Sequence, residues 1–547
     1  MKSRLSVEKL ESKSNVLSII RQSISFAPND EVEPKGMVGS FKAIQREYRG
    51  WKTDVRDKPT LAIVDLVFDE HKCNIAIVQH GIQDPDYFAE YNAFYSRQFQ
   101  RVRQTCTRVH FFRSPVDISG ILTAVDVIDD LKRSGDETLY VGFATLRPIR
   151  ICPIGATILK PRAGDFVTCR DSFEVHIAGC TFSVEGTPFM QQDNAVGTCA
   201  ETSIWTALRT MYRKDGMESL SPAEITISAS QSPMVMGRTL PNREGLSLVQ
   251  IVDVIKKAGY SSHVIKMPES AEDRELALAK IHCYIESSIP VILVLNDSSG
   301  SSDHAVAAVG HGPIRNKRDF VKAGATFDIQ LNGTVDGKLK IFDAARCIDS
   351  LIVQNDSRGP YQNLSRIKGE KGSYSIQDIR YMVPLLPKDV FMSAEEAWYS
   401  ATTLLRQMWP RELLPSMGPV IMRLYLCERH EFRSWARENN ELSKTVSRLY
   451  RNILLPRKVW VVELSYENDY CVCSAAGGTR VGEIVLDATG DSSELPFLLS
   501  HFNLNRVVGK SGQGVVFIRH VDVDTGDESF EVEHIGDEND YCPVRRG

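Results

Sequence analysis

The chain has 547 residues, which is more than one hydrophobic core normally serves, so we expect several domains. Hydrophobic residues make up 42% and charged residues 25% of the chain, a globular composition that argues against coiled coils, fibrous repeats and long disorder. The net charge of -5 gives no overall positive field, so nucleic acid is not an expected partner.

The sequence also carries information on where the protein works. No stretch reaches the roughly 18 consecutive apolar residues that cross a bilayer, and the N-terminus lacks the apolar centre of a signal peptide. The twelve cysteines are scattered and none forms a paired CxxC motif of the kind that binds zinc. We therefore expect a cytoplasmic protein with reduced cysteines, no membrane partner, and no metal or organic cofactor.

Four parts are predicted along the chain. Residues 1–35 are polar and contain one short helical stretch, 17–24, which suggests a tail or docking segment. Residues 36–185 alternate strand and helix patterns, as an N-terminal α/β domain does, and end in several short strands with turn residues. The strands are expected at 61–68, 74–81, 109–113 and 138–148, and the helices at 87–102 and 118–133.

Residues 186–385 place helices first and strands later, which is the order of an α+β domain. A C-terminal α/β domain follows at 386–547, without an obvious motif. Its helices are predicted at 393–409 and 432–454, and its strands at 459–465, 482–489 and 514–523.

Cys199 is the first candidate for chemistry. Gly197 and Thr198 break the chain before it, and apolar residues follow at helical spacing, so the cysteine should begin a buried helix. The positive end of that helix would favour a thiolate and lower the pKa below the free value of about 8.5. Gln192, with Gln191 as the alternative, could add an amide donor that forms an oxyanion hole with the Cys199 backbone. A buried structural cysteine is the simpler interpretation of Cys199 taken alone.

Two later segments supply a base and a residue to orient it. His304 opens a strand of small apolar residues, where an imidazole can face a cleft. Asn355 and Asp356 end another apolar strand, and either could accept the imidazole N–H and fix its tautomer. Each segment alone also fits a structural role, since histidines often satisfy cores and Asn or Asp often begin turns.

Together these segments resemble the core of papain-like cysteine proteases. DHAVAAVGHG (303–312) is similar to the family's histidine strand, LIVQNDSRGPY (351–361) to its strand ending in KNSWG, and the Gln192 to Cys199 segment to its oxyanion glutamine and nucleophile. The order Gln, Cys, His, Asn/Asp is that family's order, and it also occurs in bacterial double-glycine leader peptidases, where an Asp orients the histidine. The resemblance covers about residues 186–380 and implies a papain-like fold.

The sequence departs from the family in three places. The Gln to Cys spacing is one residue longer, Ala200 replaces an aromatic residue, and residues 312–348 form an insertion that we predict to be a hairpin. Asp343, inside this insertion, is a weaker candidate to orient the histidine.

The resemblance implies a peptidase that cleaves a protein or peptide substrate through Cys199, His304 and Asn355 or Asp356, and passes through a thioester. The same residues could serve a deamidase or an acyl transferase. A catalytically inactive core that acts as a binding or regulatory module is the other alternative. The flanking domains would then select substrate, gate the site, or bind a partner protein or a second copy.

Overall fold

The computed structural model forms two compact units, each built from three separate stretches of the chain. The first unit comprises Met1–Lys266, Ile289–Gly312 and Ser350–Leu385, and the second comprises Met267–Ser288, Pro313–Asp349 and Leu386–Gly547. The structure describes residues 5–25, 58–97, 102–114, 123–149, 152–192, 199–216, 219–231, 246–296, 303–313, 327–330, 338–367, 369, 373–408, 419–439, 442, 444–466, 480–490, 497–501, 506–510, 515–521 and 528–534.

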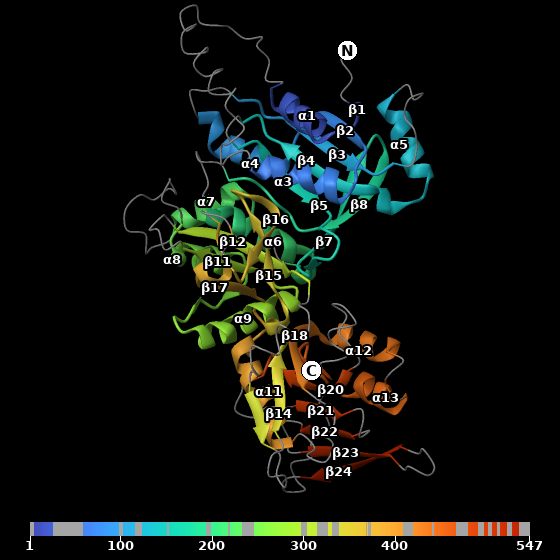
Figure 1. Cartoon of the computed structure of the whole chain (residues 1–547), viewed down its shortest axis with the longest axis vertical. Helices are drawn as coiled ribbons and strands as arrows, with labels where there is room; N and C mark the ends of the chain where they lie inside the picture. The colour runs from blue at the N-terminus through green and yellow to red at the C-terminus, as the bar shows by residue number, and fades with distance from the viewer. Residues whose placement is uncertain are drawn as a thin grey trace, which may run out of the picture. The chain divides into compact units, whose positions relative to one another are not determined.

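The first unit begins with a five-stranded sheet whose strands pair in chain order, all antiparallel (Figure 1). This meander differs from the repeated βαβ units of an α/β domain, so the N-terminal part is α+β. Its strands are β1 (Leu5–Lys9), β2 (Ile75–Ile82), β3 (Cys106–Phe112), β4 (Tyr140–Leu146) and β5 (Ile154–Leu159).

Residues 5–25 do not form a free tail, which was one of the two roles, tail or docking segment, that we had predicted for this polar region. β1 pairs along its full length with β2, and α1 (Lys13–Ser25) buries Val16 and Ile20 in the hydrophobic core of the unit. The predicted helical stretch 17–24 is confirmed within α1. Burial of the apolar positions of α1 holds the segment against the core. The overall polarity of the segment does not reveal this, because it ignores where the apolar residues lie on the helix.

Residues 61–68 were predicted as a strand and form helix instead. α3 (Lys58–Val64) runs directly into a π-helix, η2 (Asp65–Glu70). Pro59 lies in the first turn, where its fixed φ suits a helix, and Ile63 and Val64 are buried. Apolar runs of this length do not separate a strand from a buried helix by their pattern.

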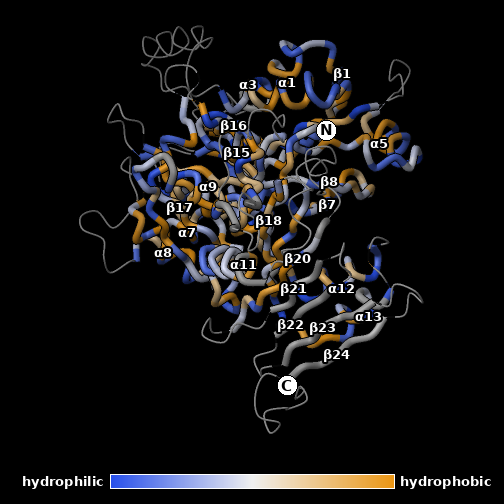
Figure 2. The backbone as a smooth tube through the Cα atoms, turned by 60° about the horizontal axis from the view of Figure 1, so that its bottom comes forward, coloured by the Kyte–Doolittle hydropathy of each residue, from blue (hydrophilic) through white to orange (hydrophobic). Residues whose placement is uncertain are grey.

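Two capped helices complete this part, α4 (Pro85–Ala93) and α5 (Ala124–Arg133). Asp84 precedes α4 and caps it by accepting a hydrogen bond from the backbone N–H of Tyr87. Thr123 caps α5 in the same way, by accepting the N–H of Asp126. α5 buries Val127, Ile128 and Leu131 on one face, and Figure 2 shows the hydrophobic and hydrophilic residues alternating along it. Short 3-10 turns, η3 (Tyr95–Arg97) and η5 (Glu137–Leu139), follow α4 and α5.

An eight-stranded antiparallel sheet carries the candidate site. Helices precede most of its strands in the chain, as the α+β prediction requires, and α6 (Cys199–Asp215) packs on β12, β11 and β15. The other helices are α7 (Pro222–Ser230) and α8 (Leu248–Lys257). The strands run β10 (Ile265–Lys266), β17 (Ile379–Leu386), β11 (Val291–Leu295), β12 (His304–His311), β15 (Ser350–Asn355) and β16 (Gly359–Ser365), with β6 (Phe166–Val167) and β9 (Ser261–Ser262) at the side. A separate hairpin pairs β7 (Asp171–Ile177) with β8 (Cys180–Gly186), and η7 (Ile376–Asp378) precedes β17.

The second unit is built on a nine-stranded sheet. The hairpin predicted within residues 312–348 is confirmed: β13 (Phe327–Gln330) pairs antiparallel with β14 (Lys338–Asp343). It joins this sheet through a parallel pairing of β14 with β18 (Val420–Glu428). All other pairings in the sheet are antiparallel, so this part too is α+β. The remaining strands are β19 (Lys458–Tyr466), β20 (Arg480–Asp487), β21 (Phe497–His501), β22 (Arg506–Lys510), β23 (Val515–Val521) and β24 (Glu528–His534).

Helices of the second unit are α9 (Ala271–Glu286), α11 (Ala394–Met408), α12 (Arg429–Glu438) and α13 (Lys444–Asn452), with the 3-10 turn η6 (Ala344–Cys347). The single helix predicted at 432–454 is thus two helices, because α12 ends at Asn439, which has an extended backbone. No helix in the described part of the chain is long and apolar enough to cross a membrane.

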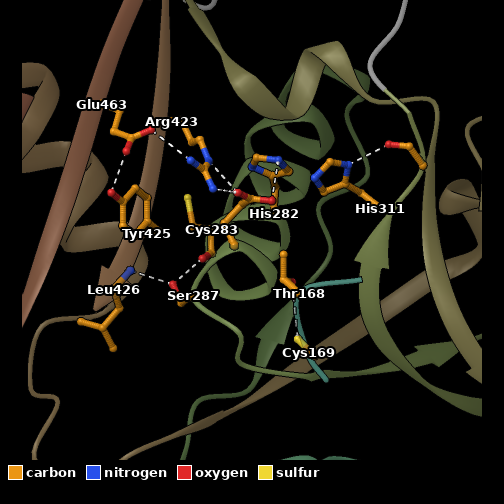
Figure 3. Close-up of polar contacts among 12 residues, drawn as sticks. Thr168, Cys169, His282, Cys283, Ser287, His311, Arg423, Tyr425, Leu426 and Glu463 are labelled. Atoms are coloured by element: carbon orange, nitrogen blue, oxygen red, sulfur yellow. Dashed lines mark hydrogen bonds and ion pairs between the residues drawn. The ribbon is translucent and has the colours of Figure 1, made fainter. Parts of the chain in front are cut away.

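A buried polar network fixes α9 to the sheet of the second unit (Figure 3). Arg423 of β18 donates to Glu286 at the end of α9 (Nε to Oε2, 2.6 Å) and to Glu463 of β19 (3.0 Å). Tyr425 donates to the same Glu463 carboxylate at 2.7 Å, and Ser287 accepts the backbone N–H of Leu426 at 2.8 Å. The carboxylates are buried, so these bonds supply the partners that burial requires.

Candidate functional site

Cys199 is the first residue of α6, as predicted. The helix that follows is buried on the expected positions, and the cysteine itself is partly exposed. A partly exposed thiol at the first turn of a buried helix combines access with a fixed position. The buried apolar positions are Ala200, Ile204, Ala207, Leu208 and Met211.

His304 is the first residue of β12, where it pairs with Leu295 at the end of β11. The Cys199 thiol lies close enough to His304 to raise the pKa of its imidazole, although the two residues are far apart in the chain. In addition, the backbone N–H of Ala305 donates to the Cys199 sulfur at 3.2 Å. The structure therefore brings together the two side chains that the sequence analysis paired.

Asn355 and Asp356 both contact the imidazole of His304 on Nε2. The Asn355 Oδ1 lies 3.2 Å from this nitrogen and the Asp356 Oδ1 lies 3.5 Å from it. Since an amide oxygen only accepts, Nε2 carries the proton and donates to Asn355. Nδ1 is then the ring nitrogen available to Cys199. The two residues were predicted as alternatives, and both face the histidine.

Asn355 and Asp356 differ in their surroundings. Asn355 is held from the other side by Ser357, whose backbone N–H and hydroxyl donate to Oδ1 at 3.1 and 2.9 Å. The Asp356 carboxyl is buried, and its Oδ1 accepts no hydrogen bond from the described part of the chain. Asn355 therefore supplies a directed acceptor, and Asp356 supplies negative charge close to the ring.

The protonation of His304 follows from these contacts. Burial lowers its pKa, but the interaction with Cys199, the charge of Asp356 and the bond to Asn355 together outweigh burial and raise the pKa to about 9. Burial also raises the pKa of Asp356, and the nearby His304 opposes that shift. At neutral pH the imidazole can hold a proton that leaves Cys199.

Tyr374 is a site residue that the sequence analysis missed. Its ring stacks on the imidazole of His304 with 5.5 Å between centroids and 17° between planes. Stacking restricts rotation of the imidazole and covers one of its faces. A lone aromatic residue in the segment GSYS gives no signal of this kind, because the contact depends on where the segment folds.

The two candidate glutamines differ in their surroundings. Gln191 is buried, and its side-chain oxygen accepts the backbone N–H of Ile154 at 3.4 Å, so it is engaged with β5. Gln192 is partly exposed and comes next in the chain toward Cys199. Residues 193–198, which join them, lie outside the described residues. The burial of Gln191 favours the partly exposed Gln192 as the amide donor.

Asp343 does not have the orienting role that we considered for it. It belongs to the second unit, where one carboxylate oxygen accepts the Ala345 N–H at 2.8 Å and caps η6. The other oxygen accepts the Trp398 indole N–H at 3.0 Å. Burial raises the pKa of Asp343 to about 6. The carboxyl is thus a structural cap, a common use of Asp where a strand ends.

His311, at the far end of β12, has a structural environment. It is buried and its Nδ1 bonds to the backbone oxygen of Gly312 at 2.8 Å, a contact drawn in Figure 3. Of the two histidines on β12, His304 is the one beside Cys199.

Comparison with known proteins found no family model, no curated protein and no solved structure that matches the chain. The site is therefore defined by its own geometry: a cysteine, a histidine and a paired Asn and Asp in contact within an α+β unit.

Proposed function

We propose that the protein is a cysteine peptidase with a papain-like core, which hydrolyses amide bonds in a protein or peptide substrate. The main support is that Cys199, His304 and Asn355 lie together: the Cys199 sulfur accepts the N–H of Ala305, next to His304, at 3.2 Å, and His304 Nε2 lies 3.2 Å from the Asn355 oxygen. This is the arrangement of nucleophile, base and orienting residue that covalent amide hydrolysis needs.

The proposed reaction uses only residues of this chain. The Cys199 sulfur attacks the carbonyl carbon, and its proton resides on His304. The side-chain amide of Gln192 and the Cys199 backbone N–H would stabilise the oxyanion. His304 then gives its proton to the leaving amine as the C–N bond breaks, and water, deprotonated by His304, hydrolyses the thioester. No metal or organic cofactor takes part in the proposed reaction, and we propose that it runs in the cytosol, where thiols stay reduced.

Identification of cleavage products tests this proposal. The purified full chain and a Cys199→Ala variant are each incubated with a proteome-derived peptide library, and new termini are identified by mass spectrometry. We expect cleavages with the natural chain that are missing with the variant.

The same data separate the alternatives. Glutamine side chains converted to glutamate, without cleavage, would indicate a deamidase, and new acyl adducts would indicate a transferase. Identical profiles for the two proteins would contradict the proposed hydrolysis and favour an inactive binding module.

The raised pKa of His304 gives a second test. The protonated imidazole is needed as the acid that releases the amine, so kcat/KM should fall as the pH rises through about 9. Alkylation of Cys199 by iodoacetamide needs only the thiolate, so its rate should not fall over the same pH range. A hydrolysis rate that declines near pH 6.5, the ordinary value for histidine, would contradict the raised pKa of His304.

A further inference from the structure

The segment that leads to Gln192 is attached to the N-terminal sheet. Phe189 and Thr157 exchange two backbone hydrogen bonds of 2.9 Å, and Gln191 donates its N–H to Ile154 at 3.0 Å. Ile154 and Thr157 belong to β5, which is the edge strand of the five-stranded sheet. Residues 189–191 thus extend that sheet by a short antiparallel pairing.

Arg147 anchors the same segment by its side chain. Arg147 follows β4 and is 1% exposed. One guanidinium nitrogen, Nη2, donates to the backbone oxygens of Gln191 at 2.7 Å and of Cys152 at 2.8 Å. The other, Nη1, donates to the carboxylate of Glu90 in α4 at 3.1 Å. A rigid fork with three fixed acceptors leaves the carbonyl of Gln191 little freedom.

The sheet makes room for this side chain at Gly155. A Cβ atom at Gly155 would lie 3.0 Å from the Cγ and 3.3 Å from the Cδ of Arg147, which is closer than nearly all such contacts. The stem of Arg147 therefore runs tightly across β5. This packing holds the guanidinium beside the glutamine segment.

α4 binds the helix of the nucleophile as well. Asp86, one turn before Glu90, accepts two hydrogen bonds from Arg209 of α6 at 2.6 and 2.7 Å. One helix of the N-terminal part thus contacts the Cys199 helix through Asp86 and the glutamine segment through Glu90 and Arg147.

From these contacts we infer that Arg147 is a positioning residue, which holds the backbone next to Gln192 so that the glutamine amide meets the oxyanion. The N-terminal sheet is then a working part of the catalytic site rather than an accessory domain. This inference rests on the proposed function. It goes beyond that function by assigning the alignment of the oxyanion hole to Arg147 and α4.

The test is a double variant, Glu90→Leu with Arg147→Met. Removing both charges avoids an unpaired buried carboxylate, which would unfold the chain. We expect kcat for peptide hydrolysis to fall about 100-fold, the usual effect of losing one oxyanion donor, with little change in KM. Alkylation of Cys199 by iodoacetamide should keep its natural rate, because that reaction needs no oxyanion hole.

Two further variants keep the test decisive. Arg147→Lys retains the charge beside Glu90 but cannot hold both carbonyls, so it should also lower kcat and leave alkylation unchanged. Arg133→Gln is the matched control, because Arg133 of α5 is 75% exposed and pairs with Asp130 of its own helix, away from α4. The control should hydrolyse peptides at the natural rate.

Full kcat in both Arg147 variants, with an active natural chain, would overturn the inference and leave the proposed function intact. Parallel loss of hydrolysis and alkylation would also overturn it, because that pattern indicates general distortion of the site. If the natural chain itself hydrolyses no peptide, the proposed function and this inference are both wrong.

Discussion

Replacing His304 by glutamine is expected to lower kcat/KM for peptide hydrolysis by at least about 10⁴-fold, because the proposed base and acid are lost together. The same change should slow alkylation of Cys199 at neutral pH, since the imidazole that accepts the thiol proton is missing. Both rates are measured on the purified full chain with a peptide from the cleavage profile.

His176→Gln is the matched control, because His176 is exposed on β7 and its Nδ1 contacts the Thr181 hydroxyl at 2.9 Å. It should leave both rates unchanged. Asn355→Ala should cost less than His304→Gln, because the Asp356 carboxylate contacts the same ring nitrogen at 3.5 Å. Hydrolysis by His304→Gln at close to the natural rate would show that His304 is not the base.

Replacing Arg209 by methionine is expected to lower the free energy of unfolding by about 3 kcal/mol. The change leaves the Asp86 carboxyl, which is 5% exposed, without the guanidinium that donates to both of its oxygens. Urea unfolding followed by tryptophan fluorescence measures the loss, and Trp205 is a suitable reporter because Arg209 lies 5.6 Å from its ring centroid.

Arg133→Met gives the comparison for this experiment. Arg133 pairs with Asp130 at the same 2.6 Å, but its side chain is 75% exposed, so the loss should stay below about 1 kcal/mol. Removing both charges of the buried pair, in Asp86→Leu with Arg209→Met, should recover most of the stability. Equal losses for the exposed and the buried pair would contradict the role of the Asp86–Arg209 pair in binding α4 to α6.

The candidate site was largely predictable because its residues lie where strands and helices begin or end. Gly197 and Thr198 before Cys199, and the short strand that His304 opens, give local signals that a single sequence preserves. The sequence could not assign separate roles to Asn355 and Asp356. They are adjacent at a strand end, and the direction of each side chain depends on the turn that follows.

Features that depend on distant contacts were missed. Arg147 follows an apolar strand, and an arginine at such a position is expected to be exposed to solvent. It is buried instead, and its guanidinium pairs with Glu90. The antiparallel order of the N-terminal sheet was missed for a similar reason. Helices between strands suggest parallel βαβ units, although each helix here returns the chain to a neighbouring antiparallel strand.

β18 illustrates a signal that was present and overlooked. Val420, Met422, Leu424 and Leu426 are buried on one face, while Arg423, Tyr425 and Cys427 are partly exposed on the other. This period of two is typical of a strand.

The parallel pairing of β14 with β18 has a consequence for synthesis on the ribosome. The β13–β14 hairpin leaves the exit tunnel well before Val420 has been translated, so the backbone groups of β14 that later bond to β18 have no strand beside them. A nascent chain at that stage presents a template for association with other polypeptides. Translation that stops before β18 would therefore release a product prone to aggregation, even though every residue of the cysteine and histidine site has already been made.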